Sequence, residues 1–280
     1  MINPEISVII STYNSVEWLR KSLIGFENQE YKNFEILIAD DGSSKDTCNF
    51  IEEFSENSQF KISHVWHEDN GFQKTKILNK ALLSCRAEYI VMTDGDCIPR
   101  KDFLTTHFHQ RQKGYFLSGG YCKLPLDLSE KISQDDIKQQ RCFDIEWNRK
   151  NTAVNMNNKK LSTGKITCKI LNKITPTNAS WNGHNSSGWK SDIMKVNGFD
   201  ERMQYGGEDR EMGERLFNLG INSKQIRYSA ICVHLDHERG YVNEEALEFN
   251  RKIREKTRKE KMIFTPHGIT KKVELITDLI

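Results

Sequence analysis

The chain has 280 residues, of which 37% are apolar, and its 41 Lys and Arg nearly balance its 39 Asp and Glu. This composition favours a folded chain of one or two domains over a disordered one. No apolar stretch is long enough to span a bilayer. The N-terminus lacks a secretion signal, and no two of the seven Cys form a CxxC pair. We therefore expect a cytoplasmic globular protein without disulfides or a zinc ribbon.

The near-neutral total hides two halves of opposite charge. Residues 1–147 hold 17 basic and 23 acidic side chains, whereas residues 148–280 hold 24 basic and 16 acidic ones. Between residues 148 and 190 there are eight basic side chains and no acidic one. Such asymmetry predicts two parts with different surfaces.

The acidic half alternates between predicted strands and predicted helices. Short apolar runs predict strands at residues 6–10, 34–39, 62–66 and 89–92. Apolar residues at helical spacing follow the first three runs, and Asn14 with Glu17 and Ser43 with Asp46 are predicted helix caps. This alternation predicts an α/β fold with a mostly parallel sheet flanked by helices. Ligands of such sheets bind at the carboxyl ends of the strands.

The basic half begins with a segment of unusual composition. Residues 148–176 are rich in Asn, Lys and Thr, which predicts an irregular or mobile insertion. A helix is predicted from residue 208 to residue 219, and a strand over residues 230–233.

A cationic segment follows Phe249. Its basic residues are Arg251, Lys252, Arg254, Lys256, Arg258, Lys259 and Lys261. They form either a solvated helix face or a peripheral contact with an anionic membrane. No nucleic-acid partner is expected, because no aromatic residues lie between the basic ones and no nucleic-acid motif occurs.

Two acidic clusters follow predicted strands in the acidic half. Asp94 and Asp96, on either side of Gly95, suit a hard divalent ion, or they belong to a turn that caps the next helix. Asp41 suits acceptance of a nucleobase N–H, with Tyr13 beside the base, or it belongs to a structural turn. The residues alone leave both alternatives open.

The basic half carries two further clusters. Glu208 and Asp209 fall at a predicted helix N-terminus, where a carboxylate suits a general base or only complements the helix dipole. His234 and His237 follow a predicted strand, where imidazole completes a metal site begun by carboxylates or is a solvated side chain.

In their order along the chain, these clusters resemble a family 2 glycosyltransferase of the GT-A fold. The resemblance in the acidic half is carried by Ser11-Thr12-Tyr13-Asn14 after the opening strand, by Asp40-Asp41-Gly42-Ser43 and by Asp94-Gly95-Asp96. These stretches are similar to the nucleotide-binding part of that family.

The basic half resembles a galactosyltransferase-type C-terminal module. This resemblance is carried by residues 188–219, which include Asn197-Gly198-Phe199-Asp200-Glu201 and Gly206-Gly207-Glu208-Asp209. The module also occurs in polypeptide GalNAc-transferases and in bacterial chondroitin-type polymerases. We expect one GT-A-like domain, with residues 1–125 as the nucleotide-sugar-binding half, residues 126–240 as the acceptor-binding and catalytic half, and residues 241–280 as a basic tail.

The resemblance implies a nucleotide-sugar site and a metal site. The implied nucleotide-sugar-binding residues are Thr12, Tyr13, Asp41, Lys74, Asp94 and Gly95. Tyr13 and Asp41 match the positions that hold uracil and ribose, and Lys74 matches a cation near the phosphates. The implied ligands of Mn²⁺ or Mg²⁺ are Asp96, His234, Asp94 and His237. Asp96 and His234 match the ligand positions, and His237 is the alternative to His234.

The resemblance also implies a base and a set of sugar contacts. Asp209 matches the base, and Glu208 lies beside it. The implied contacts of acceptor or sugar are Tyr205, Gly207, Trp181, Asn185 and Trp189, with Asn182, Gly183 and His184 in the same predicted pocket wall. Tyr205 stands where the family often has a tryptophan, so the donor preference does not transfer.

The implied reaction is an inverting, metal-dependent transfer of a hexosyl or N-acetylhexosaminyl group. The donor is a UDP-sugar, and the acceptor is a hydroxyl of a glycan or lipid-linked glycan in surface polysaccharide or lipooligosaccharide synthesis. Such acceptors place the chain in the cytoplasm, at the inner face of the membrane. The alternative is a non-catalytic carbohydrate-binding or assembly subunit of the same fold. A nucleotidyltransferase would carry a Gly-rich loop after the first strand, which residues 11–14 do not form.

Overall fold

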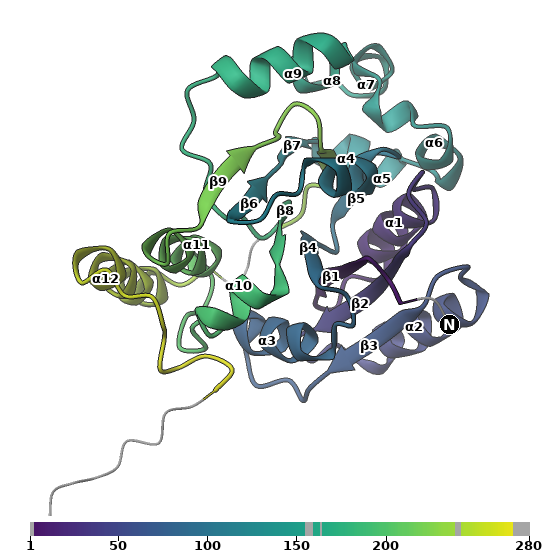
Figure 1. Cartoon of the computed structure of the whole chain (residues 1–280). Coiled ribbons are helices and arrows are strands. Elements are labelled where there is room, and N and C mark those ends of the chain that lie inside the picture. Colours follow the sequence, from purple (N-terminus) through teal and green to yellow (C-terminus); the bar gives the residue numbers. More distant parts are fainter. Residues whose placement is uncertain (1–2, 155–158, 163, 239–241, 271–280) are drawn as a thin grey trace, which may run out of the picture.

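The structure is a computed structural model that describes residues 3–154, 159–162, 164–238 and 242–270. Within these residues the largest sheet has seven strands, in the order β3-β2-β1-β4-β8-β6-β9 (Figure 1). The strands are β1 Ile6–Thr12, β2 Phe34–Asp40, β3 Ile62–Trp66, β4 Tyr89–Asp94, β6 Tyr115–Ser118, β8 Ser186–Trp189 and β9 Asn222–Gln225. Strands β1 to β4 run parallel, and β8 runs antiparallel to β4 and β6. The sheet is mostly parallel, as predicted.

Helices cover both faces of this sheet because its central strands are apolar on both sides. Ile6, Val8 and Ile10 of β1 belong to one buried cluster, and Ile9 belongs to a second one. The first cluster includes residues of α1 Val16–Glu27, α2 Lys45–Asn57 and α4 Phe103–Gln110. The second includes residues of α3 Lys74–Ser84, α10 Lys190–Lys195 and α11 Glu208–Asn218.

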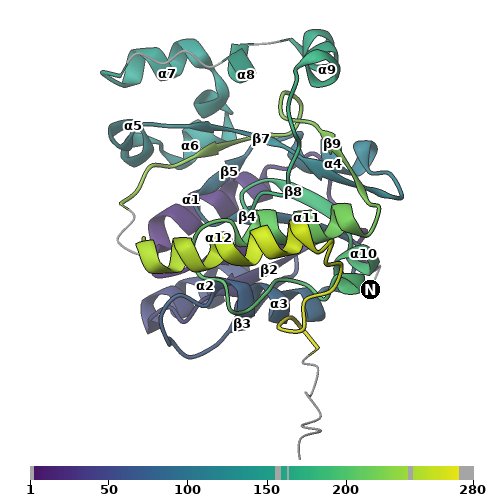
Figure 2. The ribbon, with the colours of Figure 1, turned by 90° about the vertical axis from the view of Figure 1, so that its left-hand side faces the viewer.

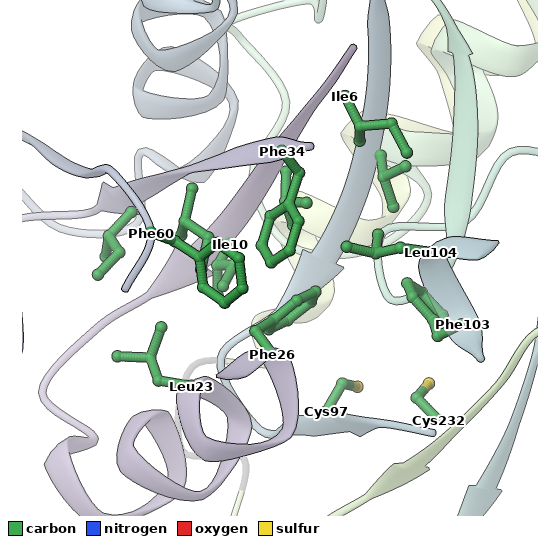
Figure 3. Packing of buried hydrophobic residues seen from close by; sticks show 14 of the residues in the cluster. Ile6, Ile10, Leu23, Phe26, Phe34, Phe60, Cys97, Phe103, Leu104 and Cys232 are labelled. Carbon is green, nitrogen blue, oxygen red and sulfur yellow. The ribbon is translucent and has the colours of Figure 1, made fainter. Parts of the chain in front are cut away.

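Aromatic side chains fill the first face. Phe26 of α1 contacts Phe103 of α4 edge to face, with ring centroids 6.4 Å apart, and the rings of Phe34 and Phe60 lie 4.1 Å apart. Figure 3 shows these rings between α1 and the sheet. Truncating such a buried ring to Ala typically costs about 3–5 kcal/mol, so this layer fixes α1 and α4 on the sheet.

A second, three-stranded sheet lies beside the first one. It has the order β5-β10-β7, with β5 Cys97–Pro99, β10 Ile231–His234 and β7 Gly120–Lys123. Strand β10 runs antiparallel to β5, and His234 pairs with Cys97. The helices that follow are α5 Leu126–Lys131, α6 Gln134–Lys138, η1 Arg141–Phe143, α7 Ile145–Asn151, α8 Lys159–Ser162 and α9 Lys165–Ile174. Residues of α5 and α6 pack on β10 in a third cluster.

The expectation of an irregular insertion at residues 148–176 is wrong for most of that segment. It holds the end of α7, all of α8 and all of α9 (Figure 2). Isoleucines recur every four residues through α9, at positions 166, 170 and 174, which is helical spacing that the Asn- and Lys-rich composition obscured. Residues 155–158 and 163 of the predicted insertion lie outside the described residues.

Neither predicted cap forms on its own helix. The chain enters α1 through Ser15, while Asn14 has a φ of 47°. The side chain of Asn14 accepts a hydrogen bond from the Ser44 backbone N–H (2.8 Å), and its own N–H donates to Ser43 Oγ (2.8 Å). These hydrogen bonds therefore join the loop after β1 to the loop after β2. The two loops meet because β1 and β2 are adjacent parallel strands that end at the same edge of the sheet.

The described part of the predicted tail packs on the rest of the fold. Helix α12, Glu244–Lys259, lies along α11, and Thr257 donates a hydrogen bond to the buried Glu211 (2.8 Å). Beyond it, the carbonyl of Thr265 accepts a bond from the side chain of Asn197 (2.7 Å). Residues 241 and 271–280 of the predicted tail lie outside the described residues, and the predicted domain boundaries stay predictions.

Among the described helices, none is both long enough and apolar enough to cross a membrane.

Candidate active site

The carboxyl ends of β1, β2 and β4 open onto a cleft with a volume of about 1250 Å³. Its wall is completed by the segment after α9, the loop before α11 and the end of β10. The predicted site residues that line it are Thr12, Tyr13, Asp41, Lys74, Asp94, Gly95, Asp96, Tyr205, Gly207, Glu208, Asp209, His234 and His237. Folding therefore brings the clusters of the acidic and basic halves to one place.

Three predicted sugar contacts lie elsewhere, and their assignment to the cleft wall is wrong. Trp181 is fully buried against Phe116, with ring centroids 5.6 Å apart. Asn185 is also fully buried, and its amide donates to two backbone carbonyls, at 2.8 and 3.0 Å. Trp189 packs on Tyr89. The intervening Asn182, Gly183 and His184 do line the cleft, so neighbours on one short loop point in opposite directions.

Asp41 lies at the end of β2 with both oxygens engaged. Its Oδ1 is 2.7 Å from His67 Nε2, and its Oδ2 accepts the Gln73 backbone N–H at 2.9 Å. Burial raises the pKa of Asp41, and these two bonds oppose the rise. Sequence reasoning missed His67. The parallel pairing of Asp40 with Trp66 places His67 beside Asp41, so the strand order was the signal that could have found it.

Tyr13 and Thr12 form the adjoining wall at the end of β1. The Tyr13 ring is half exposed in the cleft, and its hydroxyl donates to Asp69 Oδ2 at 2.9 Å. The hydroxyl of Thr12 is buried and has no hydrogen-bond partner within the part of the chain that the structure describes. A held aromatic ring offers a stacking surface, and an unsatisfied hydroxyl offers a polar contact to a bound ligand.

Asp94 is tied to a lysine. Its Oδ1 accepts from Lys74 Nζ at 2.6 Å and from Ser11 Oγ at 2.7 Å. Burial alone would raise the pKa of Asp94, but the charge of Lys74 and the hydrogen bonds from Lys74 and Ser11 together outweigh burial and hold the pKa well below its usual range. Burial likewise opposes the charge on Lys74, but Asp94 and then Glu208 raise the pKa of the lysine. Both groups are therefore charged at neutral pH.

Asp96 faces two imidazoles. Its Oδ2 lies 2.9 Å from His237 Nε2 and 3.5 Å from His234 Nε2, and the two rings stack with centroids 5.9 Å apart. The pairing of β10 with β5 explains this meeting, because His234 stands opposite Cys97. Each of the three side chains offers one potential ligand atom, and these three atoms all lie within 4.8 Å of one another. Both histidines thus lie beside Asp96, so the geometry does not select one of them.

The donor set of this cluster suits a divalent metal. The Nδ1 of His234 is buried without a hydrogen-bond partner among the described residues. A carboxylate with one or two neutral imidazoles, open to a cleft, is a set that Mn²⁺ accepts more readily than Mg²⁺ does. Asp94 is engaged with Lys74 and Ser11, whereas Asp96 points to the histidines, so the residues present fit a metal centred on Asp96.

Glu208 and Asp209 begin α11 and line the same cleft, with Lys74 near both of them. Asp209 Oδ2 accepts the Gly183 backbone N–H at 2.9 Å, and Glu208 Oε2 accepts that of Gly206 at 2.9 Å. Burial, followed by the nearby charge of Asp209, raises the pKa of Glu208 to about 7. Burial also raises the pKa of Asp209, against the bonds from backbone N–H groups. Raised carboxyl pKa values in a cleft suit proton transfer.

The glycines before Glu208 serve packing as well as the cleft. Gly206 and Gly207 have φ of 112° and 89°, which other residues rarely adopt. A Cβ on Gly206 would meet Leu247 of α12 at 2.2 Å, so the first of them allows α12 to pack. Tyr205 lines the cleft, with its ring edge to face with Phe72 at 6.2 Å.

Two family models match this chain. Residues 7–121 match the one described as glycosyl transferase family 2, and residues 172–238 match the one described as the N-terminal domain of galactosyltransferase. The first match contains Asp41 and Asp96, and the second contains Asp209 and His234. The two matches confirm the predicted resemblance to a family 2 glycosyltransferase with a galactosyltransferase-type module.

Two curated relatives are similar to most of this chain. The glycosyltransferase YfnE of Bacillus subtilis, itself described as uncharacterized, is 25% identical over 82% of this chain. Chondroitin synthase of Escherichia coli is 24% identical over 82% of it. The chain spans 64% and 34% of the lengths of these two relatives.

Two solved structures share the fold at low sequence identity. TarS 1-349 of S. aureus, in complex with UDP-GlcNAc, has a TM-score of 0.59 and 16% identity, covering 92% of this chain and 69% of that one. The mannosyltransferase PcManGT of Pyrobaculum calidifontis, in complex with GDP-Man and Mn²⁺, has a TM-score of 0.57 and 17% identity, covering 86% and 59%. The predicted GT-A fold is thereby confirmed.

Proposed function

We propose that this chain is an inverting, divalent-metal-dependent glycosyltransferase that moves a sugar from a UDP-sugar to a hydroxyl of a glycan acceptor. The observation that carries the proposal is the meeting of three chemical groups around one cleft. These are the carboxylate of Asp41, the cluster of Asp96 with two histidines, and the carboxylate of Asp209, all of which line the cleft.

The donor's nucleotide belongs at the ends of β1 and β2. Asp41 accepts a base N–H on its remaining lone pairs, and the half-exposed ring of Tyr13 stacks on the base. Thr12 supplies its unsatisfied hydroxyl. A Cβ at Gly95 would lie 3.1 Å from the Ser11 carbonyl, so glycine lets the turn after β4 approach the end of β1 closely. Lys74 places a positive charge near the phosphates.

Asp96, with His234 or His237 or both, would hold the metal. A bound divalent ion supplies electrostatic stabilisation of the negative charge on a leaving diphosphate. The ion pair with Lys74 holds the carboxylate of Asp94 in place. Of the carboxylates of Asp94 and Asp96, it is that of Asp96 which lies beside the histidines.

Asp209 is the proposed base. It takes the proton of the acceptor hydroxyl, whose oxygen attacks the anomeric carbon on the face opposite the departing diphosphate, and the configuration inverts. The Gly183 N–H orients Asp209, and burial raises its pKa toward that of a usable base. Glu208 is held by the Gly206 N–H beside it.

A role in surface polysaccharide or lipooligosaccharide synthesis is supported by the relatives. One of them is named a chondroitin synthase, and another, in Campylobacter jejuni, is named for an undecaprenol-linked acceptor. The two solved structures hold UDP-GlcNAc and GDP-Man, so the nucleotide itself must be tested.

The test is a screen of UDP- and GDP-sugars with the purified chain, measuring nucleoside diphosphate release with Mn²⁺ and after chelation. We expect release from a UDP-sugar that depends on Mn²⁺ and falls in the Asp209→Asn variant. Release from GDP-sugars alone would contradict the donor assignment. No release from any donor, together with saturable binding of glycans, would favour a non-catalytic carbohydrate-binding or assembly subunit.

A further inference from the structure

Helix α9 presents an apolar stripe to the solvent. Ile166, Ile170 and Ile174 are 78%, 51% and 66% exposed, and they follow one another at intervals of four residues. Residues four apart lie on the same face of a helix, so the three side chains form one continuous surface. Single exposed apolar residues are ordinary, but an aligned row of three needs a partner.

Basic residues border this stripe. Lys169 and Lys173 are exposed and occupy positions one residue before Ile170 and Ile174, which puts them along one side of the row. No acidic residue occurs between residues 148 and 190, so none stands beside them on α9 itself. A short helix with an apolar stripe beside lysines has the composition of helices that lie in the plane of a membrane surface.

The opposite face of α9 anchors the helix to the fold. Cys168 is buried, and the Asn172 side chain donates to Ser229 Oγ (2.7 Å) and accepts from the Tyr228 backbone N–H (3.0 Å). The carbonyl of Thr175 accepts from the Gln225 side chain at 2.7 Å. The isoleucines are therefore held outward by a docked helix rather than carried on a loose segment. Figures 1 and 2 both place α9 at an edge of the molecule.

The cationic surface of α12 differs from that of α9 because acids balance it. Arg251 pairs with Glu248 and Glu255, each at 2.7 Å, and Arg254 pairs with Glu214 at 2.6 Å. Five basic residues of α12 thus lie within 4.0 Å of an acidic side chain, namely Arg251, Lys252, Arg254, Lys256 and Arg258. The membrane contact predicted for the basic tail, which includes α12, therefore fits α9 better.

We infer that the face of α9 formed by Ile166, Ile170, Ile174, Lys169 and Lys173 docks the protein on an anionic lipid bilayer. The isoleucines enter the headgroup boundary while the lysines pair with lipid phosphates. Lys160 of α8 and Thr177 just after α9 line the cleft, so this contact holds one end of the cleft at the lipid surface. That a lipid-linked acceptor enters there rests on the proposed function.

The experiment is co-sedimentation of the whole chain with vesicles of phosphatidylcholine, with and without phosphatidylglycerol. We expect binding only to the anionic vesicles, and weaker binding as salt rises. A lysine near such a surface contributes about a factor of five, so Lys169→Gln with Lys173→Gln should weaken partitioning about 30-fold. Ile166→Ser, Ile170→Ser and Ile174→Ser together should weaken it at least about tenfold. Circular dichroism checks that each variant is folded.

The matched control removes two charges from α12, with Lys252→Gln and Lys256→Gln, and should bind as the wild type does. The inference is overturned if this control loses vesicle binding while the α9 variants keep it. It is also overturned if phosphatidylglycerol does not increase the binding of the wild type to vesicles. A wild type that is dimeric in solution, with the triple isoleucine variant monomeric, would overturn it as well. Amide hydrogen exchange should slow in α9 on addition of anionic vesicles.

Vesicle binding and sugar transfer fail separately in this design. Loss of nucleoside diphosphate release with binding retained contradicts the proposed function and leaves the membrane contact standing. Absence of binding with release retained contradicts the membrane contact alone.

Discussion

Two adjacent carboxylates at the start of α11 have different surroundings. Glu208 is buried and turned back to the Gly206 N–H, whereas Asp209 is partly exposed and accepts a hydrogen bond from the Gly183 N–H. A base must reach the proton that it removes, which favours Asp209, and the buried neighbour shapes the local charge.

Replacement of Asp209 by Asn tests this assignment. The amide keeps the size of the side chain but cannot take a proton, so we expect kcat to fall by about 10²- to 10⁴-fold with the donor KM unchanged. Asp192→Asn, which changes a buried carboxylate in the first turn of α10 outside the cleft, should keep kcat. A greater loss in Glu208→Gln than in Asp209→Asn would transfer the role of base to Glu208.

Glu208 also makes stability depend on pH. Its pKa rises from 4.5 to about 7 on folding, so the folded state holds the proton more tightly than the unfolded state does. This contribution is fully present below pH 4.5 and is lost as pH rises to about 7, amounting to about 3 kcal/mol at most. Urea unfolding of Glu208→Gln across this range should show a smaller loss of stability than the wild type. Parallel curves for the two proteins would contradict the pKa shift.

At the scale of elements, α12 packs against the loop of residues 204–207, which precedes these carboxylates, and supports its conformation. Asn250 of α12 donates to the carbonyl of Gln204 (2.9 Å), and the Gly206 backbone passes close to Leu247. The loop conformation and the packing of α12 therefore depend on each other.

Gly206→Ala should weaken the packing of α12 on this loop and lower the free energy of unfolding. The substitution places a side chain at a φ of 112°, and its Cβ would meet Leu247 at 2.2 Å. Gly220→Ala is the matched control, because φ is 89° there but nothing lies within 4 Å. Both variants carry the backbone cost of about 1–2 kcal/mol. Only Gly206→Ala also displaces Leu247 Cδ2, and this adds about 1 kcal/mol, the low end for overpacking, because that atom ends a flexible, partly exposed side chain. Thermal unfolding of the two variants measures the difference; equal losses would mean that α12 does not constrain the loop.

The sequence predicted the strands of the parallel sheet well, because β1, β2 and β4 are continuous apolar runs buried on both faces. It did not predict β5, since the three residues of that strand carry no periodicity. The sequence did not predict α9, because the Asn- and Lys-rich composition of this segment obscures the four-residue spacing of its isoleucines. The direction of Trp181 was not predictable, because a loop gives successive side chains no fixed alternation.

At the scale of the whole molecule, the candidate metal site exists only when the chain is folded. Asp96 precedes β5 and His234 ends β10, and the antiparallel pairing of these strands alone brings them together. The sequence predicted Asp96, His234 and His237 as candidate ligands, and the fold brings all three to one cleft, but neither the sequence nor the geometry selects one of the two histidines.

Because the ligands meet only in the folded state, metal binding should stabilise the fold. At Mn²⁺ about 100-fold above its Kd, binding adds about 2.7 kcal/mol to the free energy of unfolding, which raises Tm by roughly 5 °C. Asp96→Asn should lose this rise. Cys48→Ser, in the separate group of Asp40, Cys48 and His64, should keep it. If Cys48→Ser loses the rise and Asp96→Asn keeps it, the ion binds at that second group; if the wild type shows no rise, Asp96 and the histidines form a hydrogen-bonded cluster rather than a metal site.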